Sequence, residues 1–182
     1  VRRYRIGFCD VARADDQRSL MAALIPPSTV CGHKVPTIEF EPADSKVMML
    51  WLGVANSLAM DFLVRMKVSL TMSMSILASL PFPRRVSANE ATARACAIVA
   101  RLSCSGPEMV DFLRTLQRET ALVGQNLMPS DDPKERARLS AELDVLVARD
   151  LFGRTRDEMR YLLEPRDVLG PAPAVFPRLQ GR

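Results

Sequence analysis

The sequence predicts an α+β protein in which a small, mostly antiparallel sheet packs on an apolar helix and is followed by an all-helical region. Three observations lead to this fold class. Apolar and polar residues alternate near the start of the chain, one long apolar segment follows, and beyond residue 86 the apolar spacing becomes helical with clear capping signals.

Short apolar runs in the first part of the chain predict the sheet. Residues 4–9 alternate between apolar and polar or small side chains, which is typical of a half-buried strand. After a turn at residues 15–16, residues 20–25 form an apolar run that two prolines stop, so we expect a second strand antiparallel to the first. Residues 30–40, interrupted by a glycine and a proline, are expected to add a third strand.

The most apolar segment, residues 47–64, predicts one buried helix packed against the sheet. Asn56, Ser57 and Asp61 interrupt this segment, and such polar groups are costly in hydrocarbon. We therefore expect no membrane partner. Asp44 stands where the N-cap of this helix is needed.

Capping signals predict the helices that follow. Ser87 and Glu90 have the spacing of a capping box and open a helix that runs to about residue 102. A Gly-Pro pair breaks the chain before a further helix over residues 108–117. The next helix has an N-cap, a first-turn proline, a reciprocal acid and an apolar stripe, supplied in order by Asp132, Pro133, Glu135, Leu139, Leu143, Leu146 and Val147.

The last predicted helix follows a glycine C-cap at Gly153 and opens with Thr155 and Glu158 at capping-box spacing. The helix pair over residues 139–163 has the layout of a helix-turn-helix. Its charges are balanced, whereas a recognition helix should be basic, so we favour a scaffold hairpin.

The chain is predicted to have three parts, which are residues 1–86, 87–168 and 169–182. Residues 1–86 hold 11 of the 25 Lys and Arg but only 7 of the 21 Asp and Glu, so this part carries the whole net charge of +4. Such basicity suits a nucleic-acid partner. The start at Val1 and the Pro- and Ala-containing end are interpreted as the interior of a longer polypeptide and as a linker or truncated tail.

Motifs for catalysis are missing from the sequence. Its one Pro-Pro pair lacks the preceding Asp or Asn and the following aromatic residue of an amino-methyltransferase, and no Gly-rich loop for a nucleotide or methyl donor is present. Asp44 and Lys46, with Asp15 or Asp16, match half of a nuclease pattern, which is common by chance. Four cysteines without a CxxC pair, and a single histidine, favour reduced thiols in a cytoplasmic protein over a zinc site.

Three stretches in this order resemble the C-terminal region of type IIG restriction–modification enzymes and the related methyltransferases of DISARM- and BREX-like phage-defence systems. They comprise residues 4–26 with the pattern YRIGFCDVAR, residues 52–83 with LGVANS and LPFP, and residues 141–163 with AELDVLVA and LFG. The resemblance extends from Tyr4 to about Pro165. It departs from the family at Cys9, at residues 16–19 and at residues 69–74.

The resemblance implies a function without chemistry in this segment. Residues 1–86 would be the DNA target-recognition part and residues 87–168 a helical support for an adenine-specific DNA methyltransferase. No cofactor is expected in this segment, since S-adenosylmethionine would bind the catalytic domain of the parent chain. The expected partners are double-stranded DNA and the catalytic methyltransferase domain of the parent chain. In such families the parent can also be a restriction endonuclease.

Basic side chains that flank the predicted turns and the apolar helix are the candidate DNA contacts. They would neutralise phosphates and set the register on the duplex. The candidates are Arg13, Arg18, Lys34, Arg65 and Lys67. For each the alternative is a solvated surface charge, and Arg18 could equally be a buried arginine that pairs with Asp10, Asp15 or Asp16.

Two other functions compete with DNA recognition. A protein-interaction or scaffold module of a defence complex would use the helical part without touching DNA, and its binding should not weaken steeply with salt. A free-standing enzyme would require a cleft with clustered acids near Asp44.

Overall fold

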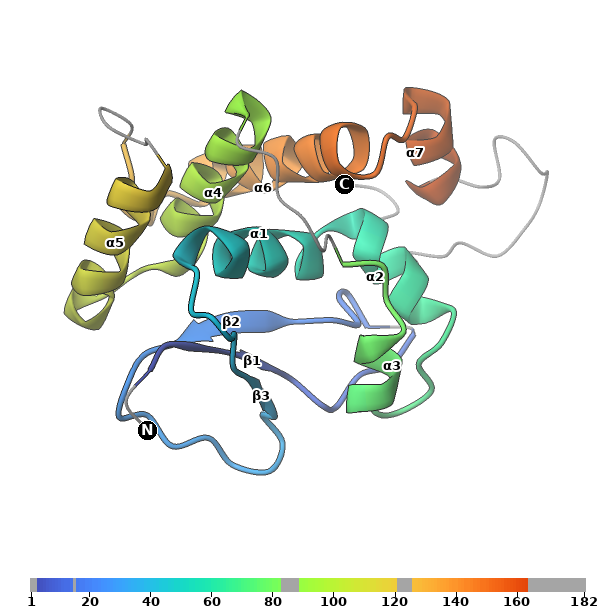
Figure 1. The fold of residues 1–182 in the computed structure, drawn as a ribbon. Helices are drawn as coiled ribbons and strands as arrows, with labels where there is room; N and C mark the ends of the chain where they lie inside the picture. The colour runs from blue at the N-terminus through green and yellow to red at the C-terminus, as the bar shows by residue number, and fades with distance from the viewer. Residues whose placement is uncertain (1–2, 15, 83–88, 121–125, 164–182) are drawn as a thin grey trace.

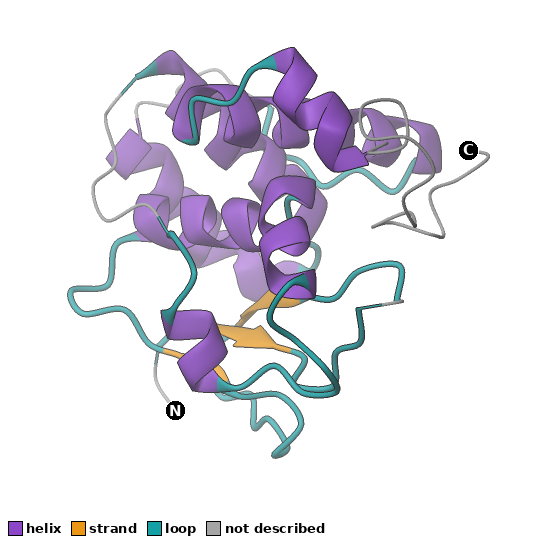
Figure 2. Ribbon diagram, turned by 90° about the vertical axis from the view of Figure 1, so that its right-hand side faces the viewer, coloured by secondary structure: helices purple, strands orange, loops and turns teal. Residues whose placement is uncertain are grey.

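A computed structural model of the chain describes residues 3–14, 16–82, 89–120 and 126–163. The predicted α+β class is confirmed, because a three-stranded antiparallel sheet is combined with seven α-helices in the described residues. Figure 1 shows three layers, with the sheet below, α1 and α2 in the middle, and α4, α5 and α6 above. Most helices lie on one side of the strands and loops lie on the other (Figure 2).

The sheet has the order β2-β1-β3, with β1 at Arg5–Phe8, β2 at Ala22–Ile25 and β3 at Thr37–Ile38. Both neighbours run antiparallel to β1. The expectation that β1 is half-buried is wrong, since all four of its residues are buried. The loop before β3 covers the second face: Arg5 donates to the Thr29 carbonyl at 2.7 Å, and a Cβ on Gly7 would lie 3.0 Å from Val35.

The apolar segment forms two helices, α1 at Ser45–Ala55 and α2 at Leu58–Arg65, instead of the single predicted helix. The break occurs at the polar residues. The Asn56 side chain accepts from the Ala22 amide and donates to the Ala22 carbonyl, both at 3.0 Å, and so completes the edge of β2. Ser57 caps α2 by accepting from the Met60 amide. As predicted, Asp44 caps α1 by accepting from the Val47 amide at 3.0 Å.

No single helix in the described ranges is long and apolar enough to cross a membrane. Helices α1 and α2 together reach that length and composition, but they are bent by 60° at their break, and most of their residues are buried against the rest of the protein.

Helix α3 was not predicted from the sequence, whereas the other remaining helices agree with the predicted ranges apart from differences at their ends. They are α3 Met74–Ala78, α4 Glu90–Ser103, the 3₁₀ turn η1 Pro107–Met109, α5 Val110–Thr120, α6 Pro133–Leu146, the π-helical turn η2 Val147–Leu151 and α7 Arg156–Leu163. The N-cap of α4 is Asn89, which accepts from the Thr92 amide at 2.8 Å. The predicted cap Ser87 lies outside the described residues.

The caps of α6 and α7 were predicted from local sequence. Asp132 accepts from the amides of the first turn of α6 as expected, but Glu135 binds Arg101 and Ser130 rather than returning to the cap. Thr155 and Glu158 cap α7 reciprocally, since each side chain accepts from the other's amide. Gly153 has φ +61°, a conformation that favours glycine at this helix end.

One hydrophobic core extends through both predicted parts of the chain. Helix α1 lies at its centre and packs on β2, α4 and α5. Gly53 allows the closest approach, because a Cβ there would lie 2.8 Å from Val99 Cγ2 in α4. The boundary near residue 86 therefore marks a change of secondary structure along the chain and not a gap between two cores.

Candidate functional site

Three loops meet at the C-terminal end of β1. The segment at residues 10–12 lies between the other two: the Asp10 amide donates to the Lys34 carbonyl at 3.1 Å, and the Ala12 amide donates to the Leu70 carbonyl at 3.1 Å. The Met72 amide donates back to the Asp10 carbonyl at 2.7 Å. Backbone hydrogen bonds thus hold together loops that are distant in sequence. In Figure 1 the segment after β1 runs to the right of the sheet toward α3, and the loop before β3 lies below the sheet.

Three of the five predicted DNA contacts are exposed on these loops. Arg13 follows the central segment and is exposed. The Lys34 ammonium lies 3.4 Å from the Asp10 carboxylate with over half of its side chain exposed. Lys67 is exposed and donates to Ser79 Oγ at 3.1 Å. We call the loops at residues 9–19, 30–36 and 66–73 the loop edge.

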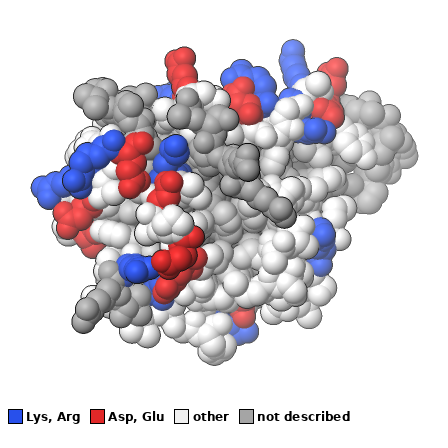
Figure 3. All heavy atoms as spheres, in the orientation of Figure 1, with Lys and Arg blue, Asp and Glu red and all other residues white. Residues whose placement is uncertain are grey.

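The loop edge also exposes apolar side chains, among them Val11, Met66 and Leu70, which are 48%, 61% and 65% exposed. On the face shown in Figure 3, Lys and Arg are interspersed with Asp and Glu and do not form one continuous basic field. The positive charges of the loop edge are therefore separate points, and that of Lys34 lies beside the Asp10 carboxylate.

Arg65 is not a surface residue, which corrects its prediction as a DNA contact. Its side chain is only 1% exposed, and its guanidinium binds the equally buried carboxylate of Asp61 at 2.7 Å. It also donates to the carbonyls of Ala14, Asp16 and Gln17. A phosphate cannot reach this guanidinium in the folded protein, so we assign Arg65 a role in holding the loop.

Asp61 completes this buried cluster from the carboxylate side. Its Oδ1 accepts from the amides of Ser19 and Leu20 at 2.7 and 3.0 Å, while Oδ2 accepts from Arg65. Both residues lie one helical turn apart on α2, so a single helix face holds both ends of the loop at residues 14–20. The i, i+4 spacing of Asp61 and Arg65 can be read from the sequence. Their backbone partners in the loop cannot, because those partners are about 40 to 50 residues away along the chain.

Arg18 is intermediate between the two interpretations made from sequence. Its side chain is 30% exposed, and its guanidinium lies 3.9 Å from the Asp144 carboxylate in α6. Its Nη1 is buried without a hydrogen-bond partner in the described part of the chain. Its ion pair is thus with an acid that is distant in sequence, and not with Asp10 or Asp16; Asp15, the third acid expected beside it, lies outside the described residues.

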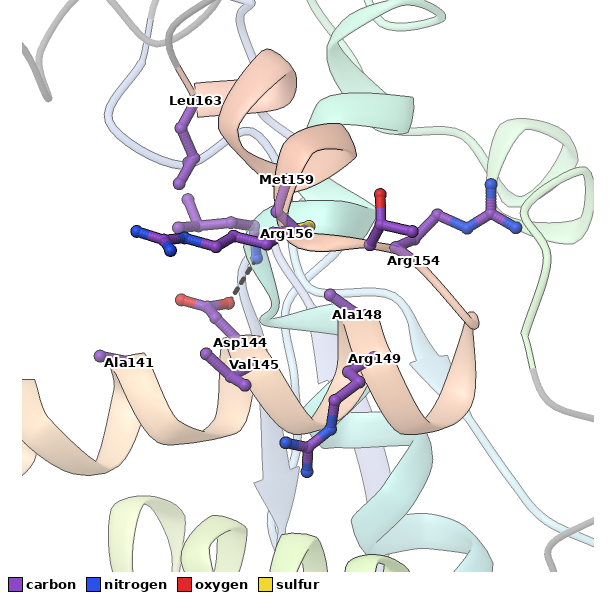
Figure 4. A pocket seen from close by; sticks show the side chains of 11 residues that line it. Ala141, Asp144, Val145, Ala148, Arg149, Arg154, Arg156, Met159 and Leu163 are labelled. Carbon is purple, nitrogen blue, oxygen red and sulfur yellow. Dashed lines mark hydrogen bonds between the residues drawn. The ribbon is translucent and has the colours of Figure 1, made fainter.

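Asp144 lines a groove between α6, α7 and the start of α2, with a volume of about 360 Å³ (Figure 4). Its carboxylate accepts from the Leu58 amide at 2.7 Å. Burial raises the pKa of Asp144, against the lowering effects of that hydrogen bond and of Arg18. The walls are apolar, with Val145 and Met159 facing each other across the groove, while Arg149 and Arg154 point outward.

The features that would favour a free-standing enzyme are not found in the described ranges. Asp44 is occupied as a helix cap, and no three His, Cys, Asp or Glu side chains there come close enough to share a metal ion. Burial raises the pKa of both Cys96 and Cys104 to about 12, so these thiols are inert at neutral pH.

Comparisons of the chain with protein-family models, with curated proteins and with solved structures give no match. The function is therefore inferred from the residues and the geometry described above.

Proposed function

We propose that this chain is the non-catalytic DNA-recognition part of a restriction–modification or phage-defence N6-adenine DNA methyltransferase. It binds duplex DNA and positions the target for the catalytic domain of the parent chain, where S-adenosylmethionine is bound. The class of enzyme comes from the resemblance of the sequence, and the structural observation that supports DNA binding is the loop edge, where Arg13, Lys34 and Lys67 are exposed on three loops joined by backbone hydrogen bonds.

DNA-binding proteins commonly use different side chains for phosphate contacts and for base contacts, and the loop edge offers both kinds. Cations at fixed positions neutralise phosphates and set the register, while neighbouring side chains meet base edges. Arg65 is excluded from this contact set, and Arg18 contributes through its partly exposed guanidinium.

The proposal is tested by fluorescence anisotropy with labelled duplex DNA over a salt series. Affinity should fall steeply with salt, and Arg13→Ala and Lys67→Ala should each weaken binding and reduce the log–log salt slope by about 1. Arg114→Ala is the matched control, since Arg114 is an exposed arginine of α5 with a 69% exposed side chain. Absence of binding at low salt, or an equal effect of Arg114→Ala, contradicts the proposal.

The groove of Figure 4 favours a second candidate, a protein-interaction or scaffold module without DNA contact. Val145 and Leu163 line it and remain 54% and 38% exposed, so an apolar partner surface would bury them. Titration with the methyltransferase region of the proposed parent separates the candidates. An apolar interface should survive high salt and be lost in Val145→Asp, whereas the DNA complex should show the opposite response.

A further inference from the structure

We infer that Asp61 and Arg65 are a positioning pair that sets the direction in which the loop at residues 13–20 presents Arg13 and Arg18. The inference rests on the proposed DNA-recognition function and adds to it two buried residues that never touch DNA. It assigns the orientation of the contact loop to α2, which lies beneath it.

Beyond their mutual ion pair, Asp61 and Arg65 bind the backbone of the loop. Arg65 Nη2 donates to the Asp16 and Gln17 carbonyls at 2.8 and 3.1 Å, and Asp61 Oδ1 accepts from the Ser19 and Leu20 amides. The planar guanidinium serves several acceptors in one geometry, which a lysine ammonium does not reproduce. The pair thus determines where the loop backbone runs.

The two cations of the loop lie next to these fixed points. The Arg13 carbonyl accepts from Ser19 Oγ at 2.8 Å, and the Ser19 amide is held by Asp61. Arg18 lies between the Gln17 carbonyl and the Ser19 amide, both of which the pair binds. A shift of the pair therefore moves Arg13 and Arg18 together.

A buried ion pair is a poor source of stability, because desolvation of the two charges offsets their attraction. Well-packed apolar residues of similar size often stabilise a protein equally well. The pair is therefore better explained by the loop geometry it imposes, and this distinction can be measured.

The test uses the double variant Asp61→Leu/Arg65→Met, with Arg94→Met/Glu142→Leu as the control that removes an ion pair between α4 and α6. Amide hydrogen exchange at Ser19 and Leu20 reports on the loop, and anisotropy with duplex DNA reports on binding. We expect the thermal midpoint to be retained, exchange at the two amides to accelerate by roughly tenfold or more, and DNA affinity to fall by a similar factor. The control should leave both readouts unchanged.

Arg65→Lys keeps the buried charge and provides a second test should the double variant fail to fold. It should also release the loop and weaken DNA binding, because one ammonium cannot serve all the acceptors. Unchanged exchange, or faster exchange with unchanged DNA affinity, overturns the inference. Failure of the wild-type chain to bind DNA overturns the proposed function, and the exchange data then decide only whether the pair holds the loop.

Discussion

The role of each basic residue near the loop edge depends on how deeply its side chain is buried. Arg13 and Lys34 are exposed, Arg65 is enclosed by carbonyls and a carboxylate, and Arg18 lies between these extremes. All are basic residues near predicted turns or helix ends, so their sequence contexts look alike. Desolvation separates them, since a buried guanidinium requires several acceptors and an exposed one requires none.

Asp144 gives a prediction at the residue scale. Burial raises its pKa in the folded state above the ordinary value of 3.8, so the folded protein binds the proton more tightly than the unfolded chain. The contribution of Asp144 to the free energy of unfolding is therefore largest at low pH and is lost as the pH rises from about 3.8 through the raised pKa. Asp144→Asn removes this pH dependence and keeps an acceptor for the Leu58 amide.

Urea unfolding of the wild type and of Asp144→Asn from about pH 4, close to the ordinary aspartate pKa of about 3.9, up to about pH 7 checks this direction. The wild type should lose stability relative to the variant as the pH increases. A relative gain would mean that the Leu58 hydrogen bond and Arg18 outweigh desolvation.

The helices and strands are defined by local signals at their ends and by tertiary contacts at their breaks. Asp132 caps α6 and Thr155 caps α7 as their sequence spacing predicts. The break between α1 and α2 depends on Asn56, whose amide pairs with the backbone of β2. In an isolated helix the Asn56 amide would bind water instead. The break between α1 and α2 therefore forms only where β2 supplies the partner of Asn56.

Gly53 gives a prediction at the element scale. Helices α1, α4 and α6 approach closely there, and Gly53→Ala would place Cβ 2.8 Å from Val99 Cγ2 and 3.4 Å from Leu143. We expect a loss of about 1–3 kcal/mol in the free energy of unfolding from overpacking, although alanine is the better helix former. Denaturant unfolding measures this, and the second substitution Val99→Ala should relieve the loss. An unchanged or higher stability of Gly53→Ala contradicts the packing described.

The whole molecule is organised around α1, which contacts the sheet on one side and the helical layer on the other. Ion pairs such as Arg94–Glu142 link α4 to α6, and Arg18–Asp144 links the loop edge to α6. The predicted recognition part and the predicted support part thus share their core and some of their charges. Any DNA-binding surface on the first part is held in place by the second.

Shared packing predicts cooperative unfolding of both parts. Trp51, the one tryptophan, stacks on Phe82 with ring centroids 4.3 Å apart and reports on the first part, while far-UV circular dichroism reports mainly on the helices. The two signals should change at the same denaturant concentration. A fragment of residues 1–86 should not fold alone, because the α4-facing side of α1 would be exposed. Two separate transitions would show that the parts are independent.

The sequence by itself determined the fold class, the placement of the strands before the helices, and the caps at Asp44, Asp132 and Thr155. Those features depend on interactions within a few residues, which a sequence displays directly. The tertiary structure alone decided the break at Asn56, the burial of Arg65, the pairing of Arg18 with Asp144 and the convergence of three loops at the end of β1. These features depend on partners that are far apart along the chain. In the unfolded chain a charged group and its acceptors are each hydrogen-bonded to water, and only folding brings them together.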